Sequence, residues 1–461
     1  MTVMVPGGGT VAPGRAAPPQ VRRSVPGRIR VISGITVASL ALLFAALAVG
    51  SATARDGLQV IGHDAGPQVV ATAGLYLALS DMDAQVANIL VMGNGWANLR
   101  QKAMGQYEQR RSEANQALLK AFELSGDNLA ERRTVQSVLD GLGRYERLAG
   151  QALILDKRAN HPPGPPPEEV VAIYRQATDL MRMVLLPQAY NLTLETGTIV
   201  RRTYDEKAVM VPLLRVAVVL SGLLAVCCLI WLQAFLAKRF RRVFGPALMV
   251  ATVTTAVALI AGAGALARDQ EALRHAKAAG FDPVLALTRA RAIGDSMQGD
   301  QSRYLLDKER ADTYEHTYLD KAQTILYTPA GNLTSYQGIV ARDSSASFLG
   351  LLGPELVGKQ GEEVLGAYRG FQAADRTYRD LVAKGRIAEA VPARLGPVTE
   401  AFAAYDRSLE ALIDQHHDEF ERAITMGEST LDNLWRLEEV AMGTIALLVI
   451  AGVWPRLKEY R

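Results

Sequence analysis

The sequence has very few cysteines and few aromatic residues. Only two of its 461 residues are cysteines, and Cys227 and Cys228 are neighbours inside an apolar run. Adjacent cysteines on a helix do not reach disulfide geometry, so the polar parts of the chain must be stable through packing alone. The pair is interpreted as small packing side chains, with palmitoylation as the alternative. Aromatic residues make up 6% of the chain, and the abundance of alanine favours helices over strands.

Motifs for common catalytic sites are also absent. The chain has no P-loop, no GxGxxG in a strand–helix setting, no HExxH and no GxSxG. His416 and His417 are neighbours, a spacing that does not place two metal ligands on one helix face. We therefore expect a protein that is not an enzyme, with no catalytic site, no cofactor and no metal.

Long apolar runs are what the sequence does contain. A bilayer core requires about 20 apolar residues in a helix. Residues 31–51, 211–236 and 244–267 meet this requirement, and 440–454 is a shorter run that follows Glu438 and Glu439. Few ionisable residues lie in these runs, which argues against a transport path through the membrane. The sequence predicts four transmembrane helices.

The basic residues indicate how these helices are oriented. The segments 1–30, 237–243 and 455–461 carry twelve basic residues and one acidic residue, a charge of +11, which leaves −8 for the rest of a chain of net charge +3. Four spans place all three segments on one side, which the positive-inside rule assigns to the cytoplasm. We expect a multi-pass protein of the cell membrane with both termini cytoplasmic and a disordered basic tail at 1–30. Alternatively, the first span is a cleaved signal peptide, since "SATAR" follows it.

A cluster of four cations connects the second and third spans. Lys238, Arg239, Arg241 and Arg242 lie in a turn of about seven residues between two apolar runs. This position favours contact with anionic lipid at the headgroup level over binding of nucleic acid. The same four residues are candidate contacts for a cytosolic partner.

Two long segments, 52–210 and 268–439, are then expected outside the membrane. In the first, an apolar stripe predicts a helix that ends at Gly93–Gly95; its residues are Leu75, Leu79, Met82, Val86 and Ile89. A helix at 96–124 follows. Asn128 and Glu131 have capping-box spacing at the start of a third helix, which "HPPGPPPEE" ends before a fourth begins near 167. This pattern predicts an antiparallel four-helix bundle.

The second segment repeats this layout less regularly. We expect helices at 283–327 and 354–384, with a loop and a short helix at 328–352 between them. A final helix carries an apolar stripe of Phe402, Tyr405, Leu409, Leu412, His416 and Phe420. The shared order of span, bundle and span predicts an internal duplication. Within the first segment, Asp81 and Asp83 flank Met82 and are candidate contacts for a cationic ligand or partner; the alternative is a solvated helix flank.

The chain resembles a group of actinobacterial four-span membrane proteins of the GlnX type. The resemblance is carried by "LYLALSDMDAQVANILVMGNG", "QYEQRRSEANQAL" and "LTRARAIGDSMQGDQSRYLLDKE". Residues 79–84 read "LSDMDA" where "LSDADA" is usual in the group. The resemblance implies a sensor–adaptor that works with a GlnH-type amino-acid-binding lipoprotein outside the cell and with the soluble Ser/Thr protein kinase G inside it. It implies no individual binding residues.

Three functions are therefore compared below. The first is a non-enzymatic transmembrane sensor or adaptor that relays an outside signal to a cytosolic partner such as a Ser/Thr kinase. The second is a direct small-ligand sensor of the chemoreceptor type. The third is a structural scaffold of the cell envelope, which self-assembles as a homo-oligomer.

Overall fold

The computed structural model describes residues 25–126, 128–240 and 245–458, and helices joined by short loops make up this part of the chain. It contains no strand, only one bridge between Tyr327 and Leu349. The predicted all-α fold class is confirmed. Arg241 and Arg242 lie outside the described residues, whereas Lys238 is exposed near the end of α6 (Leu186–Phe240), which also contains Arg239.

Among the described residues, four helices are long and apolar enough to cross a membrane, as the sequence predicts. They lie within Gly27–Met92, Glu168–Lys238, Pro246–Leu306 and Ile387–Trp454. Large apolar side chains are exposed along them, including Leu220 (63%), Ile260 (72%) and Leu447 (70%). Soluble proteins rarely expose contiguous apolar surface, but helices that face lipid do. The chain is therefore a membrane protein.

One of two compact units contains most of this apolar surface. It comprises the described residues of Met1–Ala48, Val216–Gly262 and Arg436–Arg461, contributed by α1 (Val25–Gln59), α6, α7 (Pro246–His275) and α13 (Thr399–Lys458). Small residues allow close packing here: a Cβ on Gly262 would come within 2.2 Å of the Leu47 side chain. The Gln233 amide joins α6 to α7 by donating to the Leu248 carbonyl at 3.0 Å.

The other unit contains Val49–Arg215 and Ala263–Trp435. Its first half consists of α2 (Gly66–Met92), α3 (Ala97–Leu124), α4 (Leu129–Ala159), α5 (Glu168–Leu180), the π-helix η2 (Met181–Leu185) and the start of α6. The Asn128 side chain caps α4 by accepting from the backbone N–H groups of Ala130 and Glu131, as its spacing predicts. The Leu75 to Ile89 stripe on α2 is fully buried, as predicted.

The second half of this unit departs from the expected helices at one point. The prediction of a single helix at 283–327 is wrong. The helix α8 (Asp282–Leu306) stops before Asp307, and α9 (Ala311–Ile325) packs back against it. Asp307 leaves the helical conformation (φ −120°, ψ 83°), and its carboxylate accepts two hydrogen bonds from Arg175, at 2.6 and 2.8 Å. A tertiary ion pair thus sets this turn, without a proline or glycine as a sequence signal.

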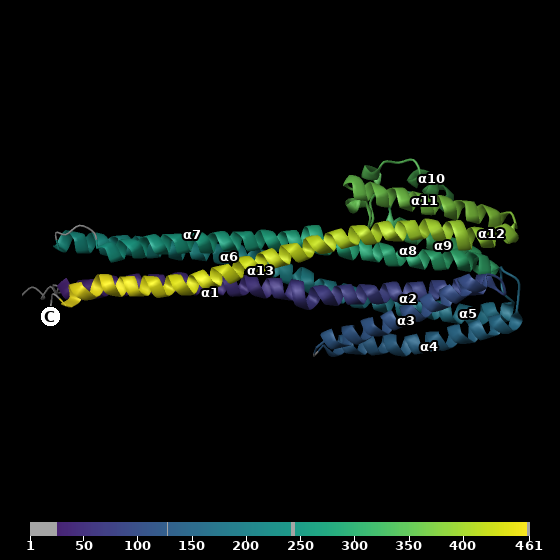
Figure 1. The fold of residues 1–461 in the computed structure, drawn as a ribbon, viewed down its shortest axis with the longest axis horizontal. Helices are drawn as coiled ribbons and strands as arrows, with labels where there is room; N and C mark the ends of the chain where they lie inside the picture. Colours follow the sequence, from purple (N-terminus) through teal and green to yellow (C-terminus); the bar gives the residue numbers. More distant parts are fainter. Residues whose placement is uncertain (1–24, 127, 241–244, 459–461) are drawn as a thin grey trace, which may run out of the picture. The chain divides into compact units, whose positions relative to one another are not determined.

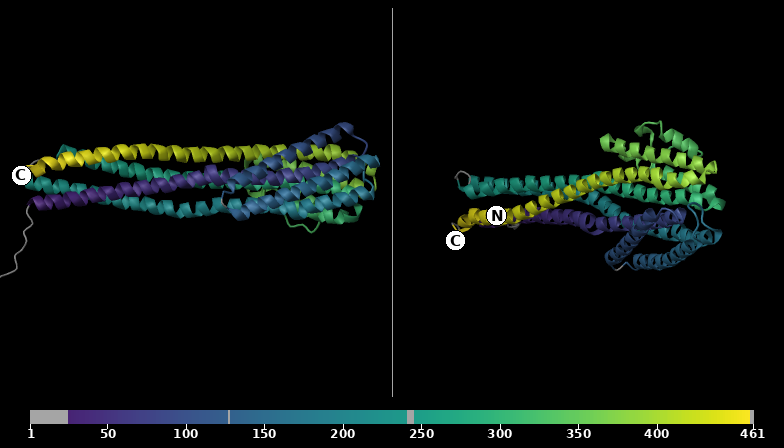
Figure 2. Two further views of the ribbon diagram at one scale, coloured as in Figure 1. Left: turned by 90° about the horizontal axis from the view of Figure 1, so that it is seen from below. Right: turned by 45° about the vertical axis from the view of Figure 1, so that its right-hand side comes forward.

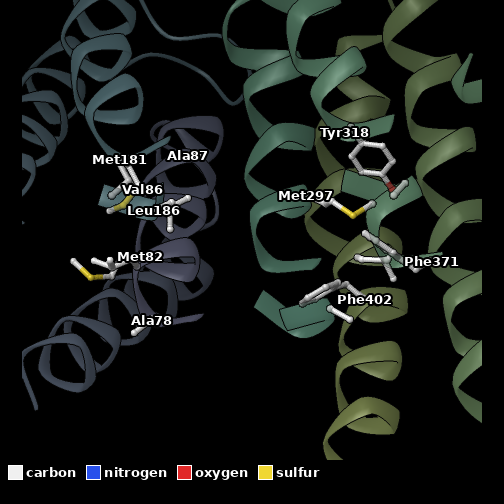
Figure 3. Close-up of a cluster of buried hydrophobic side chains, with 14 of the residues drawn as sticks. Ala78, Met82, Val86, Ala87, Met181, Leu186, Met297, Tyr318, Phe371 and Phe402 are labelled. Carbon is white, nitrogen blue, oxygen red and sulfur yellow. The ribbon is translucent and has the colours of Figure 1, made fainter. Parts of the chain in front are cut away.

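The remaining helices complete the second half. They are α10 (Leu333–Val340), α11 (Gly358–Ala383), α12 (Ile387–Ala393), the π-helix η7 (Arg394–Val398) and the start of α13. The predicted stripe on α13 is buried from Phe402 to Leu412 and at Phe420, while His416 is partly buried and His417 is exposed. Figure 3 shows Phe371 and Phe402 gathered beside Met297 and Tyr318, and Met82 and Val86 near Met181 and Leu186.

The two halves meet along α2 and α8, which pack extensively against each other. Figure 1 shows these helices at the middle of the unit, and the right-hand view of Figure 2 shows α3 and α4 in blue on one side and α10 and α11 in green on the other. The contacts therefore group the two segments that the sequence separates into one compact unit. The predicted boundaries and the internal duplication stay predictions, although the π-helices η1 (Val60–Ala65) and η3 (Ala276–Phe281) precede α2 and α8 in the same way.

Candidate functional site

A cavity of about 470 Å³ lies between the two halves of this unit. That volume falls in the usual range for small-molecule sites. The first half contributes walls from α2, η2 and α6, and the second half contributes walls from α8 and α9. The cavity is lined by Ala73, Tyr76, Arg182, Met183, Leu186, Pro187, Tyr190, Thr193, Thr288, Arg289, Ala292, Ile293, Thr317, Lys321 and Thr324. Met183 is 70% exposed, so the cavity opens to solvent beside it.

The lining combines apolar side chains with three cationic groups and no carboxylate. The cations are Arg182 from η2, Arg289 from α8 and Lys321 from α9. Tertiary packing brings the first two to the cavity from helices far apart in the sequence. A cavity with this charge favours an anion.

Arg289 is held by an aromatic residue. Its guanidinium donates a hydrogen bond to the Tyr190 hydroxyl and lies 4.8 Å from the centroid of the Tyr190 ring. The Nε atom of Arg289 is buried and has no hydrogen-bond partner. Among the described residues, Arg289 forms no ion pair with a carboxylate, so its charge is not neutralised by the protein.

Arg182 is in a similar position on the opposite half. It donates to the Thr317 hydroxyl at 3.1 Å, and its guanidinium lies 5.3 Å from the Tyr314 ring centroid. Within the described ranges it too has no ion pair with a carboxylate. Two guanidinium groups are therefore available to one bound anion.

Lys321 differs because a protein carboxylate already holds it. Its ammonium group lies 2.5 Å from Asp300 and donates to the Ser296 hydroxyl at 2.6 Å. Burial lowers the pKa of Lys321 to about 8, although the charge of Asp300 opposes this change. Lys321 is therefore mostly protonated at neutral pH but less strongly than an exposed lysine.

Aromatic side chains complete the polar part of the cavity. Tyr76 packs against Tyr190 with an edge-on geometry, at 6.3 Å between ring centroids. Burial raises the pKa of Tyr76 to about 12, so its hydroxyl stays neutral at physiological pH. A neutral phenol can donate a hydrogen bond to a ligand, and its ring provides apolar contact.

A buried chain of charged groups connects Lys321 to the first half of the unit. Asp300 accepts from Lys321 and from Arg303, the latter at 2.5 Å, and Arg303 also contacts Asp83 of α2. The Asp83 carboxylate accepts two further bonds, from Tyr145 of α4 at 3.1 Å and Thr178 of α5 at 2.7 Å. The floor of the cavity is thus continuous with a polar network that crosses between the halves.

The structure places the candidate residues Asp81 and Asp83 in the interior. Asp83 is 1% exposed and Asp81 is 7% exposed, so the alternative of a solvated helix flank is wrong. Asp81 accepts from Arg110 and Gln85, each at 2.7 Å. The cations that these acidic residues meet here belong to the protein itself. Their role as contacts for an external ligand or partner stays a prediction, as does that of Lys238, Arg239, Arg241 and Arg242.

Sequence reasoning did not identify the cavity residues. Arg182, Arg289 and Lys321 belong to three helices, and no spacing in the sequence relates them. One local signal was present: Arg182 interrupts the apolar run "LMRMVLLP". A lone cation on an apolar helix face indicates either an internal ion pair or a polar ligand.

A second cavity, of about 390 Å³, contains two histidines and two glutamates in its lining. His63 lies 2.7 Å from Glu428, and His417 lies 3.2 Å from Glu421, so these groups already pair with one another. No group of three His, Cys, Asp or Glu side chains in the described part of the chain is arranged to hold a metal ion. This cavity is a weaker candidate because it has no unpaired charge to offer.

Comparison with known proteins connects the first half of the unit to sensing. Residues 57–205 match the family model of the actinobacterial sensor domain. No curated protein and no solved structure matches the chain. The matched segment contains α2 to α5 and the start of α6, including Tyr76, Arg182 and Tyr190 of the cavity. Over these residues the chain is similar to an actinobacterial sensor domain, which supports a sensor role.

Proposed function

We propose that the chain is a transmembrane sensor that recognises a signal on the outer side of the cell membrane and relays it to a cytosolic partner. The similarity of residues 57–205 to a sensor domain supports the first part. The distribution of basic residues supports the orientation, since it places the cavity-containing unit outside.

One observation carries this proposal. The helix α6 (Leu186–Phe240) supplies Leu186, Pro187, Tyr190 and Thr193 to the cavity and continues as one helix, with Pro212 inside it, into the predicted span 211–236. Small translations or rotations of continuous helices are an established way to pass a signal across a membrane. A ligand that prefers one position of α6 would bias the span to which the same helix belongs.

The cytosolic partner is proposed from the resemblance to GlnX-type proteins, and a Ser/Thr kinase is the first candidate. The same resemblance suggests the source of the signal, which is a solute-loaded lipoprotein that docks on the cavity-containing unit. Direct binding of a small ligand is the second candidate source, and the cavity with two unpaired guanidinium groups favours it. An envelope scaffold has no comparable observation in its support.

Cysteine labelling in intact cells tests the orientation. In a background of Cys227→Ser and Cys228→Ser, single cysteines are placed at the exposed positions Lys102 and Lys238. A membrane-impermeant maleimide should label Lys102→Cys in intact cells and Lys238→Cys only after lysis. The reverse pattern would overturn the proposed orientation.

Phosphoproteomics of a deletion strain tests the relay. Deletion should change the phosphorylation of substrates of a cytosolic Ser/Thr kinase, and the wild-type chain should restore it. A variant with Lys238, Arg239, Arg241 and Arg242 changed to Gln separates two roles of these residues. A changed labelling pattern at Lys102→Cys would assign them to orientation, whereas an unchanged pattern with no restored phosphorylation would assign them to contact with the partner. Unchanged phosphorylation in the deletion strain contradicts the kinase relay.

A further inference from the structure

We infer that the cavity between the two halves binds a small organic acid directly: an anion with a carboxylate group, an apolar body and no ammonium group. This inference rests on the proposed sensor function for its meaning, but it concerns the chemistry of the cavity alone. It differs from the amino acid implied by the resemblance, because that ligand would be a zwitterion held by a separate lipoprotein.

The charge of the lining is the first argument. Arg182 and Arg289 enter the same cavity from opposite halves, and neither has a carboxylate partner among the described residues. A charge that lies partly buried without an anionic partner is costly. Guanidinium groups bind carboxylates with two parallel hydrogen bonds, so a ligand carboxylate would supply the anionic partner that both arginines lack.

The apolar walls are the second argument, and they separate an organic acid from an inorganic anion. Leu186, Ile293 and Ala73 line the cavity together with the rings of Tyr76 and Tyr190. A hydrated ion such as phosphate would leave this surface without a partner. A ligand with an aromatic or aliphatic body buries this surface, which stabilises the complex through the hydrophobic effect.

The absence of acidic groups is the third argument, and it separates an organic acid from an amino acid. No carboxylate lines the cavity in the described part of the chain. Asp300, which lies outside the lining, is engaged by Lys321 and Arg303, and the charge of Arg182 also acts on it. An α-ammonium group would therefore enter a cationic cavity without an anionic partner, and like charges disfavour its binding.

Lys321 provides the connection from ligand to protein. It lines the cavity and holds Asp300, which binds Arg303, which in turn binds Asp83 across the boundary between the halves. A ligand carboxylate competes with Asp300 for the Lys321 ammonium group. Binding would thus weaken one contact of a network that joins α9, α8 and α2.

Matched ligand pairs test the chemical class. The full-length protein in nanodiscs of zwitterionic lipid is titrated with 3-phenylpropanoate against L-phenylalanine, and with glutarate against L-glutamate, with inorganic phosphate as the anion control. Isothermal titration and thermal melting are the measurements. We expect at least one ammonium-free acid to bind at least tenfold more tightly than its amino-acid counterpart, and phosphate to have no effect at equal concentration. Binding of phosphate equal to that of the acids, or tighter binding of the amino acids, overturns the inference.

Variants locate the binding in this cavity. Arg182→Gln and Arg289→Gln should each weaken binding of the acid about tenfold or more, since each removes a charge-assisted pair. Arg133→Gln is the control, because Arg133 is exposed and lies outside the cavity. Ala73→Leu should weaken binding by narrowing the cavity beside Tyr76 while all three cations remain. If Arg289→Gln and Ala73→Leu both bind the acid with the affinity of the wild-type protein, the ligand binds elsewhere and the inference is overturned.

Failure of this inference is distinguishable from failure of the proposed function. Binding to purified protein requires no kinase and no defined orientation. If none of the acids binds to a monodisperse, cooperatively melting wild-type protein, the inference is overturned, while the labelling and phosphorylation experiments can still support a sensor that responds to a docked protein. If the acids bind as described but deletion leaves phosphorylation unchanged, the cavity stands and the relay fails.

Discussion

Arg303 and Asp83 form an ion pair although 220 positions separate them in the sequence, and each side chain is only 1% exposed. One belongs to α8 and the other to α2, so the pair lies at the boundary between the halves of the cavity-containing unit. Both side chains are buried from water. Arg303 has Asp300 as its second carboxylate partner, and Asp83 accepts from the hydroxyl groups of Tyr145 and Thr178. The stability of the joined halves should depend on both residues together.

Removing one partner of this pair should be strongly destabilising. Asp83→Ala leaves the Arg303 guanidinium buried beside a single carboxylate, and a broken buried pair costs about 3–5 kcal/mol. Thermal unfolding in mild detergent should show a large drop in melting temperature. The double variant Asp83→Leu/Arg303→Met should recover part of the loss, because it removes both charges. Arg386→Gln is the control, since its pair with Glu389 is exposed and should matter little. A melting temperature of Asp83→Ala equal to that of the control would contradict the prediction.

Asp269 should make the protein less stable as the pH rises toward neutrality. Its carboxylate is 0% exposed and has no hydrogen-bond partner, and burial raises its pKa to about 7 from an ordinary value near 3.8. Between these values the folded state keeps a proton that the unfolded state has lost, so the free energy of unfolding falls between pH 4 and pH 7 and is constant above. The full effect corresponds to about 4 kcal/mol.

The measurement for Asp269 is a comparison of melting temperature against pH in wild type and Asp269→Asn. The variant should melt at a higher temperature at pH 8, and the difference should shrink or reverse toward pH 4. Other carboxylates titrate in both proteins, so only the difference is informative. A difference that is constant with pH would show that Asp269 titrates normally.

The turn at Asp307 should depend on its carboxylate. Asp307→Ala removes both hydrogen bonds from Arg175 and should reduce stability by about 2–3 kcal/mol, the usual range for bonds to charged groups. Glu309→Gln provides a matched control, because Glu309 contacts the same arginine at 2.7 Å but is 73% exposed. Limited proteolysis between α8 and α9 should accelerate in the first variant only. Equal rates would mean that the turn is set by other contacts.

Close helix packing in the membrane-associated unit should not tolerate a side chain at Gly262. A Cβ there would meet Leu47 of α1 at 2.2 Å, so Gly262→Val forces the two helices or the leucine to move, at a cost of about 1–3 kcal/mol. Gly264→Val is the control, since its Cβ would meet nothing within 4 Å. Melting of the two purified variants in the same detergent is the comparison. If both melt alike, the close approach does not contribute to stability.

Local patterns predicted a large part of this fold. The stripe from Leu75 to Ile89 is buried on one helix, Asn128 caps another, and four apolar runs coincide with four helices that are able to cross a membrane. Each of these features is set by neighbours within a few turns of the chain, through periodicity, capping and span length. The incorrect prediction of one helix across Asp307 has a long-range cause, because the partner of Asp307, Arg175, lies 132 residues away in the sequence.

The candidate site also depends on contacts between residues that are distant in the sequence. The sequence by itself determined that the chain is helical, that it contains four apolar runs, and which faces of α2 and α13 are buried, because these properties follow from short-range spacing. Only the tertiary structure decided that the two long segments share one unit, that Asp83 meets Arg303, and that Arg182, Arg289 and Lys321 line one cavity. Those relationships arise from packing between separate helices, and helical periodicity carries no information about which faces will meet.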